Sequence, residues 1–184
     1  MHYSEEELIN GCIKGDRLMQ KMLYERFCKR MLAICLRYSK AQQEAEDILQ
    51  ESFIKIFEHI KTFRKECPLE QWIKRIVINT ALKHNRSKLY MYPALDIEDL
   101  EKPVDENITL SDFHYNELLE MIQRLAPRYQ IVFNLYAIEG FQHKEIAGML
   151  GITEGTSKSQ FARARALLQQ MIVEKKRVNY ERYT

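Results

Sequence analysis

The chain has 184 residues, enough for two small helical domains, and its 46% apolar and 29% charged residues are typical of a soluble globular protein. Its formal net charge is only +2, a balance that neither requires nor excludes a nucleic-acid partner. The longest apolar run, Met31 to Leu36, is far shorter than the ~20 residues of a membrane span, so no membrane insertion is expected.

The composition also excludes several kinds of chemistry. Residues 1–7 lack the basic and then apolar pattern of an export signal, which predicts a cytoplasmic protein. The four cysteines form no C-x-x-C pair and the histidines are scattered, so we expect reduced cysteines in a core and neither a metal nor another cofactor. Without a phosphate-binding glycine loop, an H-E-x-x-H motif or a nucleophile elbow, the chain is not expected to be an enzyme.

Apolar residues recur at helical spacing from the beginning of the chain, with few Gly or Pro between them. A capping box formed by Ser4 and Glu7 opens a first helix that runs to Ile13. Three further helices are expected at about 18–38, 42–60 and 69–88. The four helices are predicted to pack as one domain, residues 1–88.

The helix predicted at 42–60 carries a second, polar face. At spacings i, i+3, i+4 and i+7 stand two carboxylates, an amide and an aliphatic side chain: Asp47, Gln50, Glu51 and Ile54. A solvated surface is the simplest interpretation.

The helix predicted at 69–88 has a polar stripe that contains no acid. Its members are Arg75, Asn79, Lys83 and Arg86. A stripe of this kind suits a phosphate backbone. Trp72 lies on the inward side and is interpreted as a core residue.

Residues 89–110 break the helical pattern with Pro93 and Pro103, and they carry six acids against one lysine. Low hydrophobicity and charge of one sign predict an extended acidic linker. A passive tether is the simplest role for it. A second domain is predicted at 111–184, with helices from Ser111 or Asp112 to Leu125 and at about 128–138.

Residues 141–168 have the pattern of a helix-turn-helix. The first helix has one apolar or small stripe made by His143, Ile146, Ala147 and Leu150. Gly151 can end this helix in the left-handed conformation, and Thr153 can cap the next one. An ordinary helical hairpin with a basic surface is the alternative.

The second helix of this motif is expected to turn Ser157, Phe161, Ala164 and Leu168 inward. The side chains left for a DNA major groove are Lys158, Ser159, Ala162 and Arg163. Arg163 has the geometry for a bidentate contact to guanine. Residues to either side are better placed for phosphates; these are Thr156, Gln160 and Arg165.

Four runs of sequence resemble a known family. The run E-I-A-x-x-L-G-I-T-E-G-T-x-K-S-x-x-x-R-A-R-x-x-L is similar to region 4 of bacterial sigma factors of the extracytoplasmic function (ECF) group, within the sigma-70 family, as is L-A-P-R-Y-Q-I-V-F before it. The runs A-E-D-I-L-Q-E-S-F-I-K-I-F and W-I-K-R-I-V-I-N-T-A-L resemble sigma region 2. The resemblance covers about residues 18–173.

The resemblance implies an all-α protein in which region 2 (1–88) and region 4 (111–184) are joined by the linker 89–110. Its expected partners are promoter DNA and core RNA polymerase, through the beta-prime coiled-coil and the beta flap. The family's coiled-coil contacts fall on the 47–54 face, at Asp47, Gln50 and Glu51. The family's linker threads a polymerase channel, and many relatives are held inactive by an anti-sigma factor.

For promoter DNA, the resemblance implies that Asn79 contacts a base of the minus-10 element while Arg75, Lys83 and Arg86 contact its backbone. The loop from Phe63 to Cys67 would bound a pocket for an extruded base. The second helix of the helix-turn-helix would read the minus-35 element.

One position departs from the family pattern, because Ser157 stands where relatives usually have Val. Its hydroxyl is expected to bond to a carbonyl one turn earlier, which makes Ser157→Val neutral or stabilising. Two other classes of protein remain as alternatives: a one-component regulator that uses only the helix-turn-helix, and a helical adaptor without a DNA role.

Overall fold

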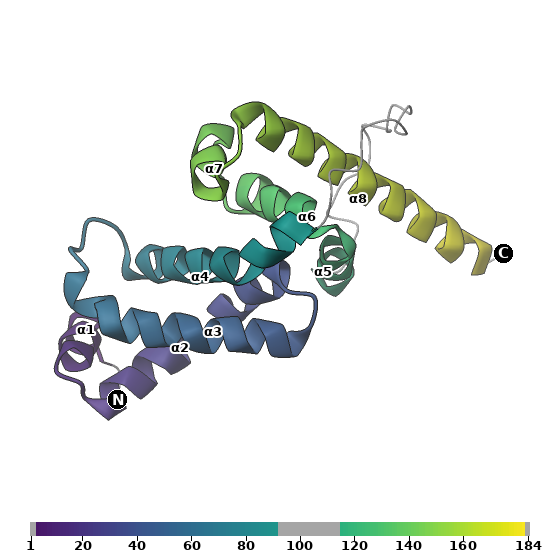
Figure 1. The fold of residues 1–184 in the computed structure, drawn as a ribbon. Coiled ribbons are helices and arrows are strands. Elements are labelled where there is room, and N and C mark those ends of the chain that lie inside the picture. The colour runs from purple at the N-terminus through teal and green to yellow at the C-terminus, as the bar shows by residue number, and fades with distance from the viewer. Residues whose placement is uncertain (1–2, 92–114, 183–184) are drawn as a thin grey trace. The chain divides into compact units, whose positions relative to one another are not determined.

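The computed structural model describes residues 3–91 and 115–182, and every regular element in these ranges is a helix, as predicted (Figure 1). The chain divides into two compact units, residues 1–86 and 87–184. The described parts of each unit bury a core of their own.

The first unit is a bundle of helices whose ends follow local sequence signals. It consists of α1 (Glu5–Ile13), α2 (Arg17–Tyr38), α3 (Gln42–His59), the 3-10 turn η1 (Ile60–Thr62) and α4 (Leu69–Met91). The predicted capping box is present at α1, since Glu7 N donates to Ser4 Oγ and Ser4 N donates to Glu7 Oε2. Asp16 caps α2 by accepting the N–H groups of Leu18 and Met19.

Apolar stripes of α2, α3 and α4 form the core of this unit. α2 buries Phe27, Met31 and Cys35 among others, and α3 packs beside it (Figure 1). α4 lies along these helices and is tied to them by three polar contacts: Lys55 Nζ to Thr80 Oγ1 at 3.2 Å, Asn85 Nδ2 to the Tyr38 carbonyl at 2.8 Å, and Arg30 Nη1 to Glu70 Oε2 at 2.6 Å. The polar stripe of α4 therefore rests on a fixed support.

All four cysteines are free, as expected from their spacing. Cys12 and Cys35 are buried, and burial raises the pKa of the Cys12 thiol to about 11 and that of Cys35 to about 12. Both side chains are therefore neutral core residues at physiological pH.

The second unit contains the helix-turn-helix. Its elements are α5 (Tyr115–Arg124), α6 (Pro127–Phe133), the π-helical turn η3 (Asn134–Ile138), α7 (His143–Leu150) and α8 (Glu154–Arg182). Its core joins α5 to α8 and includes Met121, Ile122, Leu125, Ala164, Leu168 and Ile172. α8 thus has a buried stripe that fixes which of its faces remain open.

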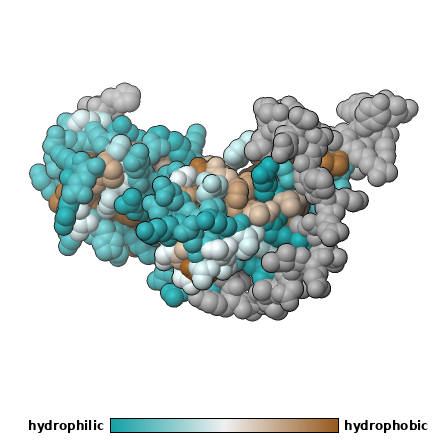
Figure 2. Space-filling model, turned by 90° about the horizontal axis from the view of Figure 1, so that it is seen from above, coloured by the Kyte–Doolittle hydropathy of each residue, from teal (hydrophilic) through white to brown (hydrophobic). Residues whose placement is uncertain are grey.

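The predicted boundaries differ from the structure mainly after residue 88. α4 continues to Met91, beyond the predicted start of the linker, and the rest of the linker lies outside the described residues. The predicted beginning of the following helix at Ser111 or Asp112 also lies outside them. No described helix is both long and apolar enough to span a membrane. The face in Figure 2 is mostly hydrophilic, with hydrophobic residues in separated patches.

Candidate functional site

The predicted polar face of α3 is present in the structure. Asp47 and Gln50 are exposed, Glu51 is half-buried, and Ile54 exposes 59% of its surface. An exposed isoleucine beside two carboxylates gives this face both apolar area and negative charge. The structure thus brings the four predicted residues together on one surface.

Glu51 has a partner within its own helix. Lys55 Nζ lies 2.7 Å from Glu51 Oε1 and also donates to Thr80 of α4. The hydrogen bond from Lys55 is the main cause that lowers the pKa of Glu51, and Lys83 and His84 of α4 add smaller charge effects. The carboxylate is therefore charged at neutral pH and linked through Lys55 to the helix that carries the basic stripe.

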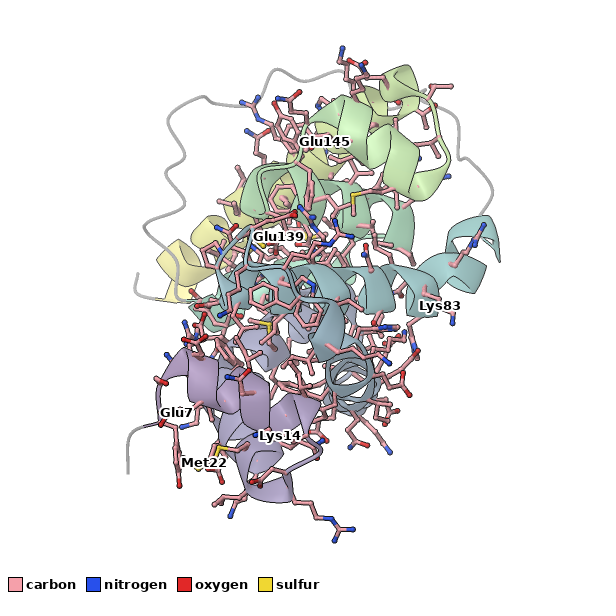
Figure 3. All side chains as sticks on the ribbon, turned by 90° about the vertical axis from the view of Figure 1, so that its left-hand side faces the viewer. Glu7, Lys14, Met22, Lys83, Glu139 and Glu145 are labelled. Carbon is pink, nitrogen blue, oxygen red and sulfur yellow. The ribbon has the colours of Figure 1, made fainter. Side chains whose placement is uncertain are left out.

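All four predicted residues of the α4 stripe are exposed, namely Arg75, Asn79, Lys83 and Arg86. Figure 3 labels Lys83 on this face of the helix. The opposite face buries Ile73, Val77 and Ala81, which keeps the stripe outward. Trp72 is half-buried and packs against Phe63, with ring centroids 5.4 Å apart, consistent with a structural role.

The loop before α4 borders a pocket. The pocket has a volume of about 480 Å³ and is lined by Glu5, Glu6, Ile9, Phe63, Lys65, Glu66, Cys67 and Pro68. The loop wall was expected from the sequence, but the wall contributed by α1 was not. The Ser4–Glu7 capping box and the helical spacing of apolar residues predicted α1, but neither indicates which part of the chain the helix packs against.

The helix-turn-helix has the expected turn. Glu145, labelled in Figure 3, closes a capping box with Gln142 at the beginning of α7. Gly151 ends α7 with φ of +67°, the left-handed conformation that a glycine adopts without strain. Thr153 Oγ1 accepts the N–H of Thr156 at 3.0 Å, the predicted cap of α8.

The inward stripe of α8 is also as predicted. Ser157 and Ala164 are fully buried, Leu168 is buried and Phe161 is half-buried. Of the side chains assigned to the major groove, Lys158, Ser159 and Ala162 are exposed. Lys158 Nζ pairs with Glu154 Oε1 at 2.7 Å, and Ser159 Oγ donates to the Thr156 carbonyl.

Arg163 differs from the expectation of a freely exposed guanidinium. It is half-buried, and its buried Nη1 has no hydrogen-bond partner among the described residues. A bidentate base contact that uses Nη1 would therefore require the side chain to rearrange. Among the residues expected to face phosphates, Arg165 is exposed whereas Thr156 and Gln160 are half-buried.

Ser157 forms a different contact from the one expected. Its Oγ lies 2.9 Å from Nδ1 of His143 on α7, and no bond to a carbonyl one turn earlier is found. His143 in turn stacks on Tyr136, with ring centroids 4.2 Å apart and planes at 10°. The hydroxyl on the packed face thus satisfies a histidine of the neighbouring helix, which sequence spacing within one helix could not indicate.

These features define a helix-turn-helix protein built from two all-helical units. The family description "Sigma-70 region 2" matches residues 23–89, and "Sigma-70, region 4" matches residues 115–168. The two matches lie in different units and in the order in which the sigma regions occur.

Curated relatives match along most of their length. The chain is 28% identical to the ECF RNA polymerase sigma-E factor of Haemophilus influenzae, over 92% of this chain and 95% of that one. It is 27% identical to the RNA polymerase sigma-H factor of Pseudomonas aeruginosa, over 88% and 90% of the two chains, and 26% identical to SigM of Mycobacterium tuberculosis, over 92% and 85%.

A solved structure has the same fold. The sigma factor RpoE of Bartonella quintana, in complex with the anti-sigma factor NepR, aligns with a TM-score of 0.51 at 19% identity, over 83% of this chain and 95% of that chain. The chain belongs to the sigma-70 family, in the ECF group.

Its function is therefore that of a sigma factor, which directs RNA polymerase to promoters and is a non-catalytic regulatory protein. The one-component interpretation is not supported, because the region 2 match occupies the part of the chain where a sensing domain would lie. The roles of individual residues on α3, α4 and α8 remain predictions.

Proposed function

We propose that the first unit binds both core polymerase and the minus-10 element, and that the second unit reads the minus-35 element. The assignment follows the predicted domains, with residues 1–88 as region 2, 89–110 as an acidic linker and 111–184 as region 4. The exposed Ile54 within the acidic face of α3 is the observation that carries the proposal. A single exposed isoleucine is ordinary by itself, but on a face with two carboxylates it adds apolar area to a surface whose charge can orient a basic partner.

The partner proposed for the α3 face is the beta-prime coiled-coil of core polymerase. Asp47 and Glu51 supply charge that orients a basic partner, while Ile54 supplies apolar area and Gln50 hydrogen bonds. Glu51 already forms an ion pair with Lys55 of the same helix. A basic group of the partner would therefore have to bind the Glu51 carboxylate alongside Lys55 or displace it.

The α4 stripe is proposed to hold the non-template strand of the minus-10 element. Arg75, Lys83 and Arg86 are exposed cations suited to phosphates, and Asn79 is an amide placed among them that can read a base edge. The pocket beside the loop Phe63–Cys67 is proposed to receive an extruded base. Its volume falls within the ~300–1,000 Å³ of small-molecule sites.

The beginning of α8 is proposed to enter the major groove at the minus-35 element. Lys158, Ser159 and Ala162 are exposed there, and Arg163 reaches a base once its side chain turns outward. Thr156, Gln160 and Arg165 would contact phosphates on either side. The second unit is also proposed to contact the beta flap of polymerase.

An anti-sigma factor is proposed as a further partner. It is supported by the relatives' group and by RpoE of Bartonella quintana, whose solved structure contains an anti-sigma factor. A cytoplasmic location is proposed with it, since polymerase and promoters are found there.

Co-elution with core polymerase tests the proposal. Asp47→Lys combined with Glu51→Lys should abolish co-elution and run-off transcription while the helical content is unchanged, because neither side chain is in the core. Glu25→Lys, a charge reversal at an exposed position of α2, serves as the control and should bind normally. Unchanged polymerase binding by the double variant would exclude the α3 face as the docking surface.

A further inference from the structure

We propose that Glu6 of α1 is a positioning residue that holds the loop Phe63–Pro68 in the shape needed to discriminate between bases. The inference rests on the proposed role of the pocket in receiving an extruded base. It extends the promoter-reading surface to a helix that lies before residue 23, where the region 2 match begins.

α1 and the loop share the pocket directly. Glu5, Glu6 and Ile9 form one wall, and residues 63 and 65–68 form the other. The width of the pocket is therefore set by how α1 and the loop are held relative to each other. A flat base that enters between them would contact both walls.

One ion pair joins the two walls. Lys65 Nζ lies 2.8 Å from Glu6 Oε1, a contact between residues 59 positions apart in the chain. The same hydrogen bond is the main cause that lowers the pKa of Glu6, so the carboxylate is charged at neutral pH. Both side chains are largely exposed, and a pair of this kind adds little to overall stability. Its effect is therefore on orientation.

The backbone at Lys65 has an unusual conformation. Lys65 has φ of +58°, and among the described residues it is the one non-glycine with positive φ. This left-handed conformation is unfavourable for a lysine and persists only where neighbouring contacts fix it. Besides backbone hydrogen bonds at Phe63 and Pro68 and the Arg64–Glu66 pair within the loop, the loop is held by the ion pair with Glu6 and by the packing of Phe63 on Trp72.

α1 is a firm anchor for the pair. Glu6 lies in the first turn, which the Ser4–Glu7 capping box fixes. Leu8 and Cys12 are buried on the other side of the helix, and Ile9, which lines the pocket beside Glu6, is buried too. Because α1 is fixed to the core of the unit, the ion pair with Glu6 fixes the loop relative to that core.

Loss of the pair should widen the range of loop conformations and weaken discrimination between bases in the pocket. Polymerase binding through α3 should remain. We expect Glu6→Lys or Lys65→Glu to reduce the ratio of transcription between the preferred and other bases about two- to fivefold, the range of an exposed ion pair. The exchanged pair, Glu6→Lys with Lys65→Glu, should restore the ratio.

The experiment uses holoenzyme reconstituted with the full chain. 2-Aminopurine placed in turn at each minus-10 position of the non-template strand identifies the base that becomes unstacked. Run-off transcription at fixed salt is then measured on four promoters that carry A, C, G or T at that position. The ratio of transcription between the preferred base and the others is compared, because a uniform change in affinity for the DNA backbone cancels in this ratio. Glu25→Lys, which breaks the exposed Lys21–Glu25 pair within α2, is the matched control and should leave the ratio unchanged.

The outcomes separate the two proposals. If no base becomes unstacked with the unaltered chain, the pocket is not a base site and both proposals about it are wrong. If a base becomes unstacked but both single variants keep the parental ratio, or if the exchanged pair is no better than the single variants, Glu6 has no positioning role. Restoration by the exchanged pair supports it, because the exchange restores the attraction between positions 6 and 65 while both original side chains are absent.

Discussion

Ser157 is fully buried between the helices of the helix-turn-helix, and its hydroxyl is the hydrogen-bond partner of His143 Nδ1. Ser157→Val would put a methyl group against that ring nitrogen. We now expect destabilisation by about 1–3 kcal/mol, because a partly buried polar group loses its partner. Urea denaturation measures the change.

Ser157→Ala provides the control, because it removes the hydroxyl without adding volume. It should also be less stable than the parent, by about 1 kcal/mol. Equal stability of the parent and the Val variant would show that the His143 contact contributes nothing. That result would restore the expectation drawn from the sequence.

Arg163 is the residue on which base reading by α8 depends most. Arg163→Ala should reduce the discrimination between bases, measured as binding free energy, by about 1–3 kcal/mol at one position of the minus-35 element and by little at the others. Arg165→Ala should instead weaken binding evenly and reduce the salt dependence, as a phosphate contact does. The measurement is holoenzyme binding across single-base variants at fixed salt. An even loss with Arg163→Ala would make Arg163 a phosphate contact.

The inward or outward direction of most residues could be predicted because one helix has one period. Ser157, Ala164 and Leu168 are buried as the spacing indicated. What could not be predicted is the partner of each polar group. The bond from Ser157 to His143 joins two helices across a turn, and the half-burial of Arg163 depends on its packing, so neither is encoded in the period of α8.

At the scale of elements, α1 packs closely against α2 because Gly11 has no side chain at the contact with Met19. A Cβ at Gly11 would lie 2.2 Å from Met19 Cγ and 2.6 Å from Met19 Cβ, closer than packed atoms approach. Gly11→Ala should therefore push α1 away from α2 and destabilise the first unit by about 1–3 kcal/mol, as overpacking does. Chemical denaturation followed by circular dichroism measures this loss.

Gly148→Ala is the matched control for Gly11→Ala. Gly148 is exposed within α7, and a Cβ there would meet no atom within 4 Å. Because alanine favours a helix over glycine, this variant should be stabilised by about 0.5–1 kcal/mol. If the two substitutions had the same effect, the contact between Gly11 and Met19 would not be what fixes α1.

Helix positions were predicted closely because caps and stripes are local signals, as at Ser4 and Asp16. The π-helical turn η3 was not predicted. Its bond from Glu139 N to the Asn134 carbonyl spans five residues and leaves no mark on a periodicity of 3.6. The α1 wall of the pocket was missed for a related reason, since it is formed by contact between distant parts of the chain.

At the scale of the whole molecule, two units with separate cores imply two separable DNA-reading surfaces. Asn79 on α4 and Arg163 on α8 belong to different units. Asn79→Ala should weaken holoenzyme binding to promoters with some minus-10 sequences by about 1–3 kcal/mol, and Arg163→Ala should weaken binding likewise for some minus-35 sequences. Since distant, independent sites are additive, their combination should equal the sum to within about 0.5 kcal/mol.

A double-mutant cycle on holoenzyme binding tests this independence. Four proteins, the parent, both single variants and the double variant, are measured on one promoter at fixed salt, together with Lys83→Ala as a variant expected to affect all promoters evenly. Additive losses support two readers that act through separate contacts. A coupling above about 1 kcal/mol would mean that one unit changes how the other meets DNA, and the assignment of one promoter element to each unit would then be wrong.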